Sequence, residues 1–152
     1  ADYGIRYCLI CLYLRRLLFL SDIAILSAAV ADYTAVKVEK EKMKKGADSI
    51  TLTLKPTVDI AASLGKIKKA SQLLAGFALE TNNEIKNATA KLKRKNLDLI
   101  VLNSLKEPGA GFEHSTNRIT IIDKYNNIDK FELKSKEEAA RDILDKIVSM
   151  IK

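Results

Sequence analysis

Three short apolar runs constrain the fold of this chain more than any other feature of its sequence. They are residues 22–28 (DIAILSA), 73–79 (LLAGFAL) and 97–103 (LDLIVLN). Continuous runs of this length are typical of strands that are buried on both faces, as in parallel sheets. Parallel strands need a long connection between them, and helical patterns occupy the segments that separate these runs.

Two of those segments have the periodicity of amphipathic helices. Residues 56–67 (PTVDIAASLGKI) place apolar side chains at helical spacing, and Thr57 or Asp59 is available to cap the start. Residues 83–95 present a second apolar face at the same spacing. Strand and helix signals therefore alternate, which predicts one α/β domain whose sheet is covered on both faces.

Further elements are predicted outside the parallel core. Residues 49–55 (SITLTLK) alternate in the manner of a half-exposed strand, and residues 117–123 and 130–134 predict a hairpin around two adjacent asparagines. Ser135 with Glu138 three residues later forms a capping box, which predicts the start of a last helix with an apolar stripe. The predicted fold class is α/β: a Rossmann-like, mostly parallel sheet with helices on both faces and an added antiparallel hairpin.

The 152 residues carry a net charge of +7, and the basic residues gather at 37–45 and 86–95. Such a charge suits a polyanion, which can be a nucleic acid, a nucleotide or a phosphorylated metabolite. Neither cluster contains the aromatic residues that single-stranded nucleic-acid sites interleave with basic ones, so a small phosphorylated ligand is favoured. Residues 37–46 are either a cationic loop that closes over phosphates or an ordinary exposed connection.

Neither a zinc site nor a membrane span is expected. Cys8, Cys11 and His114 are the only Cys and His residues, one short of the four ligands of a structural zinc ion. Residues 8–20 (CLICLYLRRLLFL) are strongly apolar, but they are too short to span a bilayer and are interrupted by two arginines. We interpret this run as a buried or partner-covered segment, and reduced thiols fit a cytoplasmic protein.

Small and polar residues follow the apolar runs, at the strand ends where ligands bind in open parallel sheets. Ala28 and Ala29 follow the first run, and their small side chains allow a ring or a phosphate to approach the backbone. Asp32 comes next and can accept hydrogen bonds from an amino group or a sugar hydroxyl. Lys91 and Lys95 are four residues apart and share one helical face. Together these residues predict a pocket for an anionic ligand.

Six motifs occur in an order that resembles bacterial phosphopantothenate–cysteine ligase, the synthetase portion of the bifunctional coenzyme A biosynthesis flavoprotein. They are AILSAAVADY, EKMKK, LKPTVDIAASLG, GFALETNN, AKLKRKNLDLIVLN and GFEHSTN. The resemblance covers about residues 21–152. It implies a division into a divergent apolar lead-in (1–20) and the C-terminal portion of the ligase domain (21–152).

The resemblance also implies a role for individual residues. Those it assigns to nucleotide binding are Ala28, Ala29, Asp32, Val58, Asp59, Ile60, Phe77, Lys91 and Lys95. Asp32 would contact the nucleotide, and Phe77 would pack against the base or ribose. Lys91 and Lys95 would hold the triphosphate. Lys42 resembles the lid lysine that neutralises phosphate charge during acyl transfer, and is the expected catalytic residue.

The implied reaction joins 4′-phosphopantothenate to cysteine at the expense of CTP, with Mg²⁺. FMN would belong only to a decarboxylase domain outside this chain. The family forms dimers, so a homo-oligomer is expected. The first strands of the ligase domain have no counterpart in this sequence, and their absence would leave a sheet edge and apolar surface that residues 8–20 or a second copy could cover. A nucleotide-binding module without catalysis remains an alternative, and a basic nucleic-acid-binding domain ranks behind both.

Overall fold

The computed structural model describes residues 3–37, 41, 49–104 and 115–151. Its elements are α1 (Tyr3–Phe19), β1 (Ile23–Leu26), β2 (Tyr33–Ala35), β3 (Leu54–Pro56), α2 (Ile60–Ile67), β4 (Leu73–Glu80), α3 (Glu84–Arg94), β5 (Leu99–Ser104), β6 (Thr116–Asn117), β7 (Ile119–Asp123), β8 (Ile128–Lys130), β9 (Lys134–Ser135) and α4 (Lys136–Ile151). Lys42 and His114 lie outside the described residues.

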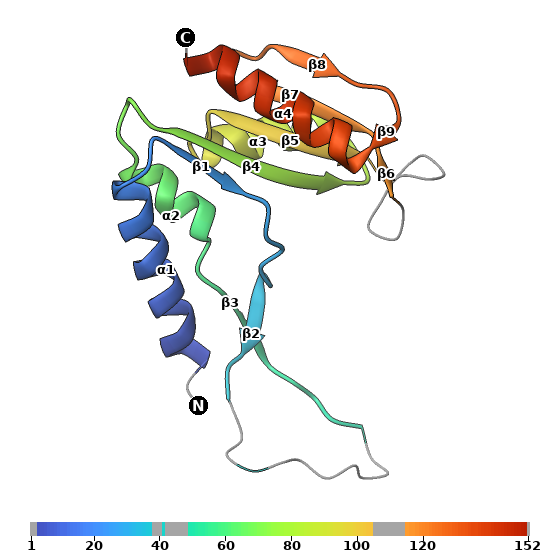
Figure 1. The fold of residues 1–152 in the computed structure, drawn as a ribbon. Helices are drawn as coiled ribbons and strands as arrows, with labels where there is room; N and C mark the ends of the chain where they lie inside the picture. Colours follow the sequence, from blue (N-terminus) through green and yellow to red (C-terminus); the bar gives the residue numbers. More distant parts are fainter. Residues whose placement is uncertain (1–2, 38–40, 42–48, 105–114, 152) are drawn as a thin grey trace.

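A five-stranded sheet with the order β1-β4-β5-β7-β8 forms the centre of the molecule (Figure 1). The three apolar runs supply β1, β4 and β5, which are mutually parallel. β7 runs antiparallel to β5, and β8 is antiparallel to β7. The predicted mostly parallel sheet with an added hairpin is confirmed, although the second hairpin strand is Ile128–Lys130 and not 130–134.

Helices cover both faces of this sheet, as predicted. Alternate residues of the strands point to opposite sides, so neighbours such as Leu99 and Ile100 belong to different apolar clusters. The cluster on one face receives buried side chains from α1, α2 and α3, and the cluster on the other face receives Ala139, Ile143 and Ile147 from α4. The capping box opens α4, because the Ser135 N–H donates to Glu138 Oε2 at 3.0 Å.

The β1 strand is less buried than its apolar sequence predicts. Ile23 and Ile25 are 39% and 41% exposed, since β1 is an edge strand and the described residues place no helix over this end of the α4 face. The run 8–20 does not cover them. It forms most of α1, which packs against α2 and buries Leu18 in the cluster on the opposite face.

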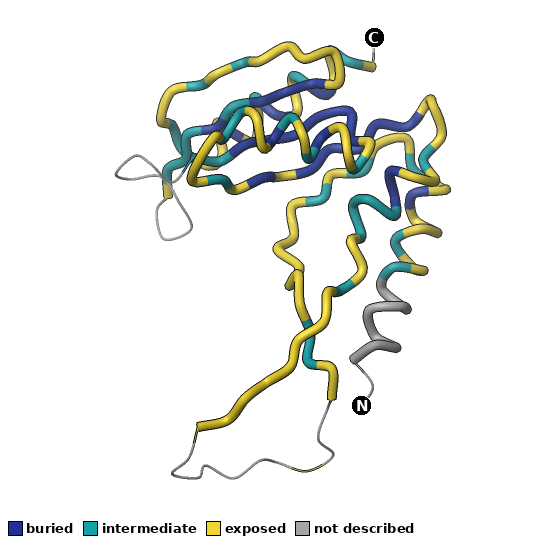
Figure 2. The backbone as a smooth tube through the Cα atoms, turned by 180° about the vertical axis from the view of Figure 1, so that it is seen from behind, coloured by how far each residue is buried: buried dark blue, intermediate teal, exposed yellow. Residues whose placement is uncertain are grey.

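The predicted strand 49–55 is mostly wrong as an element of the sheet. Only Leu54–Pro56 is a strand, and it pairs antiparallel with β2 in a two-stranded arm that projects from the domain (Figure 1). The arm is exposed along most of its length (Figure 2). The alternation predicted a half-exposed strand, but residues 49–55 are exposed at every position, because this segment pairs only with β2 and packs against no sheet face.

Candidate functional site

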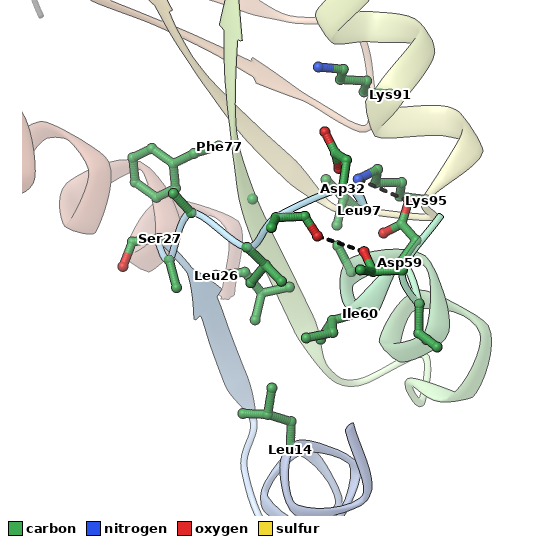
Figure 3. A pocket seen from close by; sticks show the side chains of 18 of the residues that line it. Leu14, Leu26, Ser27, Asp32, Asp59, Ile60, Phe77, Lys91, Lys95 and Leu97 are labelled. Atoms are coloured by element: carbon green, nitrogen blue, oxygen red, sulfur yellow. Dashed lines mark hydrogen bonds and ion pairs between the residues drawn. The ribbon is translucent and has the colours of Figure 1, made fainter. Parts of the chain in front are cut away.

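A cleft of about 750 Å³ opens beyond the carboxyl end of β1, beside the middle of β4 (Figure 3). Most of its lining comes from four segments: the loop after β1, the start of α2, the middle of β4 and the C-terminal end of α3. β1 ends opposite Gly76, and β4 continues for four more residues to Glu80. The loop that follows β1 therefore meets residues distant in sequence beside the middle of β4.

All nine residues predicted to bind nucleotide line this cleft. They are Ala28, Ala29, Asp32, Val58, Asp59, Ile60, Phe77, Lys91 and Lys95. Their proximity is a property of the structure, whereas their individual roles stay predictions. The tenth site residue, Lys42, lies outside the described part of the chain.

The loop after β1 is fixed against the segment that leads into α2. The Thr57 hydroxyl donates to the Ala31 carbonyl at 2.6 Å, and the Thr57 N–H donates to the Asp32 carbonyl at 2.9 Å. These two hydrogen bonds hold the small residues 28–31 at the mouth of the cleft. Thr57 is thus a positioning residue for the loop, and Asp59, not Thr57, caps the helix.

Asp59 serves both the helix and the cleft. Its Oδ1 accepts a hydrogen bond from the Ala62 N–H at 3.0 Å, and its Oδ2 lies 3.1 Å from Lys95 Nζ. Burial raises the pKa of Asp59, but the Ala62 hydrogen bond and the charges of Lys95 and Arg94 outweigh burial, so this pKa lies below its ordinary value. The ionised carboxylate therefore anchors the Lys95 side chain beside the cleft.

Lys91 is held in the same way by a different carboxylate. Its Nζ lies 2.5 Å from Glu80 Oε1 at the end of β4, and the Glu80 side chain is only 13% exposed. Asn87 extends this contact, because its Nδ2 donates to the Asn82 carbonyl at 2.8 Å and to Glu80 Oε2 at 3.4 Å. Both predicted phosphate-binding lysines are thus paired with carboxylates.

Phe77 approaches the cleft from the other side of the sheet. Its side chain points to the same face of β4 as those of Leu73 and Ala75, which belong to the apolar cluster under α4. Lys91 and Lys95 come from α3, which covers the opposite face. Figure 3 shows Phe77 and Lys91 on opposite sides of the β4 strand. The cleft therefore extends around the end of β1, with an aromatic side chain on one face of the sheet and cations on the other.

Sequence reasoning missed Arg94. This exposed residue lines the cleft together with Lys91 and Lys95, at positions i, i+3 and i+4 of one helix. The spacing alone would have placed all three cations on one face.

Two negative findings apply to the described ranges. The described side chains, those of residues 11–37, 41, 49–104 and 115–151, include no group of three His, Cys, Asp or Glu that could hold a metal ion. No helix within these ranges combines the length and apolarity that crossing a membrane requires.

Comparisons with known proteins agree with this architecture. The family model for the DNA/pantothenate metabolism flavoprotein C-terminal domain matches residues 14–151. The crystal structure of the C-terminal domain of coenzyme A biosynthesis bifunctional protein CoaBC is 37% identical with a TM-score of 0.72, and the match covers 93% of this chain and 62% of that chain.

Two curated relatives are similar in sequence. The coenzyme A biosynthesis bifunctional protein CoaBC of Bacillus subtilis (strain 168) is 46% identical over 132 residues, which are 87% of this chain and 32% of that protein. A cysteine/cysteine sulfinic acid decarboxylase from an unknown prokaryotic organism is 65% identical over 130 residues, which are 86% of this chain and 36% of that protein. This chain thus spans about a third of the length of either relative. It belongs to the DNA/pantothenate metabolism flavoprotein C-terminal domain family.

Proposed function

We propose that this chain provides the nucleotide-binding part of a phosphopantothenate–cysteine ligase of coenzyme A biosynthesis. The observation that carries the proposal is the single cleft in which nine residues from four segments converge. Family membership and the 46% identity to CoaBC of Bacillus subtilis support the same activity.

The ligase reaction has two steps. The carboxylate of 4′-phosphopantothenate attacks the α-phosphorus of CTP, which releases pyrophosphate and leaves an acyl-cytidylate. The amine of cysteine then attacks the acyl carbon and displaces CMP, which forms the amide. Because the substrates supply their own nucleophiles, the protein mainly aligns them and neutralises charge.

The cleft offers groups for both tasks. Lys91 and Lys95 supply ammonium donors for phosphate oxygens, and the exposed carboxylate of Asp32 can accept a hydrogen bond from the cytosine amino group or from the ribose. The small residues 28–31 leave room for the nucleoside beside the backbone. Lys42 is the residue proposed to neutralise phosphate charge during acyl transfer.

Mg²⁺ is proposed as the ion that accompanies the triphosphate. Such ions are commonly held by one or two carboxylates together with substrate phosphates, so a protein site of three ligands is not required. Asp32 is a carboxylate of the cleft that could provide one ligand. Bound Mg²⁺ would supply charge neutralisation at the phosphates. FMN has no role in this cleft and would bind in a decarboxylase domain.

The decarboxylase activity named for the relative of unknown prokaryotic origin is not proposed for this chain. The matched segment makes up 36% of that protein, and largely the same stretch of this chain matches CoaBC. The proposed partners are CTP, 4′-phosphopantothenate and cysteine, without nucleic acid or membrane, and the proposed compartment is the cytoplasm.

A Lys42→Gln variant separates the ligase from a non-catalytic nucleotide-binding module. In a protein that also contains the first strands of the ligase domain, we expect pyrophosphate release from CTP when 4′-phosphopantothenate and cysteine are present, and little release with ATP. Lys42→Gln should lower this rate on the order of 10²-fold, because a cation that stabilises developing charge is lost. The dissociation constant for CTP, measured by calorimetry, should stay within about twofold.

A Lys86→Gln variant is the matched control, because this exposed lysine of α3 does not line the cleft. Its turnover should equal that of the wild-type chain. CTP binding without pyrophosphate release would instead identify a binding module. Equal turnover in Lys42→Gln would overturn the role proposed for Lys42.

We also propose that the chain self-associates through the uncovered part of the α4 face. Leu144 and Val148 of α4 are 52% and 49% exposed, on the flank of the helix away from Lys146. Lys146 pairs with Asp123 and Asp129 at β7 and β8, so the opposite flank faces β4 and the exposed isoleucines of β1. Burial of this apolar surface between two copies would stabilise a dimer.

Light scattering on a sizing column tests this association. The wild-type chain should elute with twice the monomer mass, and a Leu144→Asn/Val148→Asn double variant should elute as a monomer. Asp145→Asn changes an exposed polar residue of the same helix and should leave the dimer intact. A wild-type chain that is monomeric at the highest soluble concentration would contradict the proposal.

A further inference from the structure

The last turn of α3 presents three cations to the cleft. Lys91, Arg94 and Lys95 occupy positions i, i+3 and i+4, so their side chains emerge from one face of the helix. All three line the cleft, whereas Lys93 of the same turn does not. The end of this helix therefore contains three cations that line the cleft and one cation, Lys93, that does not and can serve as a control.

The three cations differ in their partners. Lys91 is paired with Glu80 at 2.5 Å and Lys95 with Asp59 at 3.1 Å, so the charge of each lysine is already matched. Within the ranges that the structure describes, Arg94 has no carboxylate at ion-pair distance. It acts on Asp59 only through a longer-range charge interaction. Arg94 thus contributes the unmatched positive charge of this face.

The chemistry of arginine suits the end of a polyphosphate chain. A guanidinium stays charged at every pH that proteins tolerate, and its planar fork donates two parallel hydrogen bonds to a phosphate group. An ammonium that must first leave a carboxylate gains less from a new anion, because it loses an existing ion pair. An unpaired guanidinium has no such partner to give up.

We propose that Arg94 binds the terminal phosphates of the nucleoside triphosphate, the part that leaves as pyrophosphate, and so makes affinity depend on the number of phosphates. Lys91 and Lys95 join this contact by exchanging Glu80 and Asp59 for phosphate oxygens. The inference rests on the proposed function, since it assigns a subsite within the same cleft.

A purely structural role for Arg94 makes a different prediction. Basic residues in the last turn of a helix stabilise it through the helix dipole, and Lys93 occupies the same turn as Arg94. If the dipole were the whole explanation, Arg94→Gln and Lys93→Gln would lower the melting temperature equally, and neither would change the affinity for phosphate.

Calorimetric titration of the full chain tests the subsite with CTP, CMP and inorganic tripolyphosphate at one ionic strength. Arg94→Gln should weaken CTP and tripolyphosphate about tenfold, which corresponds to the loss of one charge-assisted contact, and should change CMP affinity less than twofold. Arg94→Lys should recover part of the loss, because the charge returns without the fork. Lys93→Gln should bind all three ligands like the wild-type chain.

Each result decides the inference. Equal affinities in Arg94→Gln and Lys93→Gln, or an equal loss of CMP and CTP in Arg94→Gln, would overturn it. Wild-type chains that bind tripolyphosphate through Arg94 but bind neither nucleotide would support the subsite and overturn the proposed ligase. Wild-type chains that bind none of the three ligands would overturn both.

Discussion

Replacing Gly65 with alanine should lower the free energy of unfolding by about 3 kcal/mol, the upper end of the usual cost of overpacking. A Cβ atom at Gly65 would lie 1.9 Å from the Lys95 carbonyl oxygen. This oxygen belongs to the backbone, so no side-chain rotation can relieve the clash. The sign of the effect is informative, because glycine to alanine within a helix otherwise stabilises by up to about 1 kcal/mol.

The clash would also reach the cleft. Gly65 lies on α2 and contacts the end of α3, where Asn96 Nδ2 donates to the Gly65 carbonyl at 2.7 Å. The same two helices carry Asp59 and Lys95, which pair across the cleft wall. Separation of α2 from α3 would pull this pair apart. Any folded Gly65→Ala protein should therefore bind CTP more weakly.

Gly76→Ala is the matched control, measured by urea unfolding followed by circular dichroism. A Cβ atom at Gly76 would approach Leu97 Cδ1 at 2.9 Å, the tip of a flexible side chain that can move. Its loss of stability should be clearly smaller than that of Gly65→Ala. A Gly65→Ala protein as stable as the wild-type chain would show that α2 and α3 do not approach this closely in solution.

The sequence predicts the elements of this fold better than their partners. Uninterrupted apolar runs identified β4 and β5, because strands buried on both faces need such residues. The same argument placed Ile23 and Ile25 in the core, yet both are exposed. An apolar sequence shows that a strand can be buried, but the elements packed beside the strand determine whether it is buried.

The candidate site follows a similar division. The convergence of Asp32, Asp59 and Lys95 was implied by the resemblance to the ligase family, and strand-end geometry alone does not predict it, because Lys95 precedes β5 and Asp59 precedes α2. The pairing of Lys91 with Glu80 could not be predicted, because it depends on the approach of α3 to the end of β4. The sequence does not show that Lys91 and Lys95 are paired with carboxylates, so it does not distinguish Arg94, unpaired among the described residues, from these two lysines.

A buried carboxylate, Asp98, joins three parts of the sheet and should be the most sensitive charged residue of the core. It is 2% exposed and accepts a hydrogen bond from the Leu74 N–H of β4 at 2.8 Å. Lys68, which follows α2, and Lys124, which follows β7, both pair with its oxygens, the latter at 3.0 Å. The Lys68 side chain is only 9% exposed, so its charge has little access to water.

Asp98→Asn should lower the free energy of unfolding by about 3–5 kcal/mol at pH 7, because it leaves a buried ammonium without its counter-charge. Glu137→Gln removes the carboxylate of an exposed i,i+4 pair with Arg141 and should change stability little. Urea unfolding at pH 7 measures both effects. A loss for Asp98→Asn no larger than that for Glu137→Gln would contradict a structural role for the pair.

Acid pH provides a second test of Asp98. Burial raises its pKa, but the hydrogen bonds from Lys68, the Leu74 N–H and Lys124 outweigh burial, so the pKa lies below its ordinary value in the folded chain. A group with a depressed folded pKa stabilises the protein fully above its unfolded pKa of about 3.9, and this stabilisation is lost as pH falls through the folded value. The stability difference between the wild-type chain and Asp98→Asn should therefore be constant from about pH 8 to pH 5 and shrink below about pH 4. A difference that begins to shrink near neutral pH would mean that the folded pKa is raised, and that Lys68 and Lys124 do not hold this carboxylate ionised.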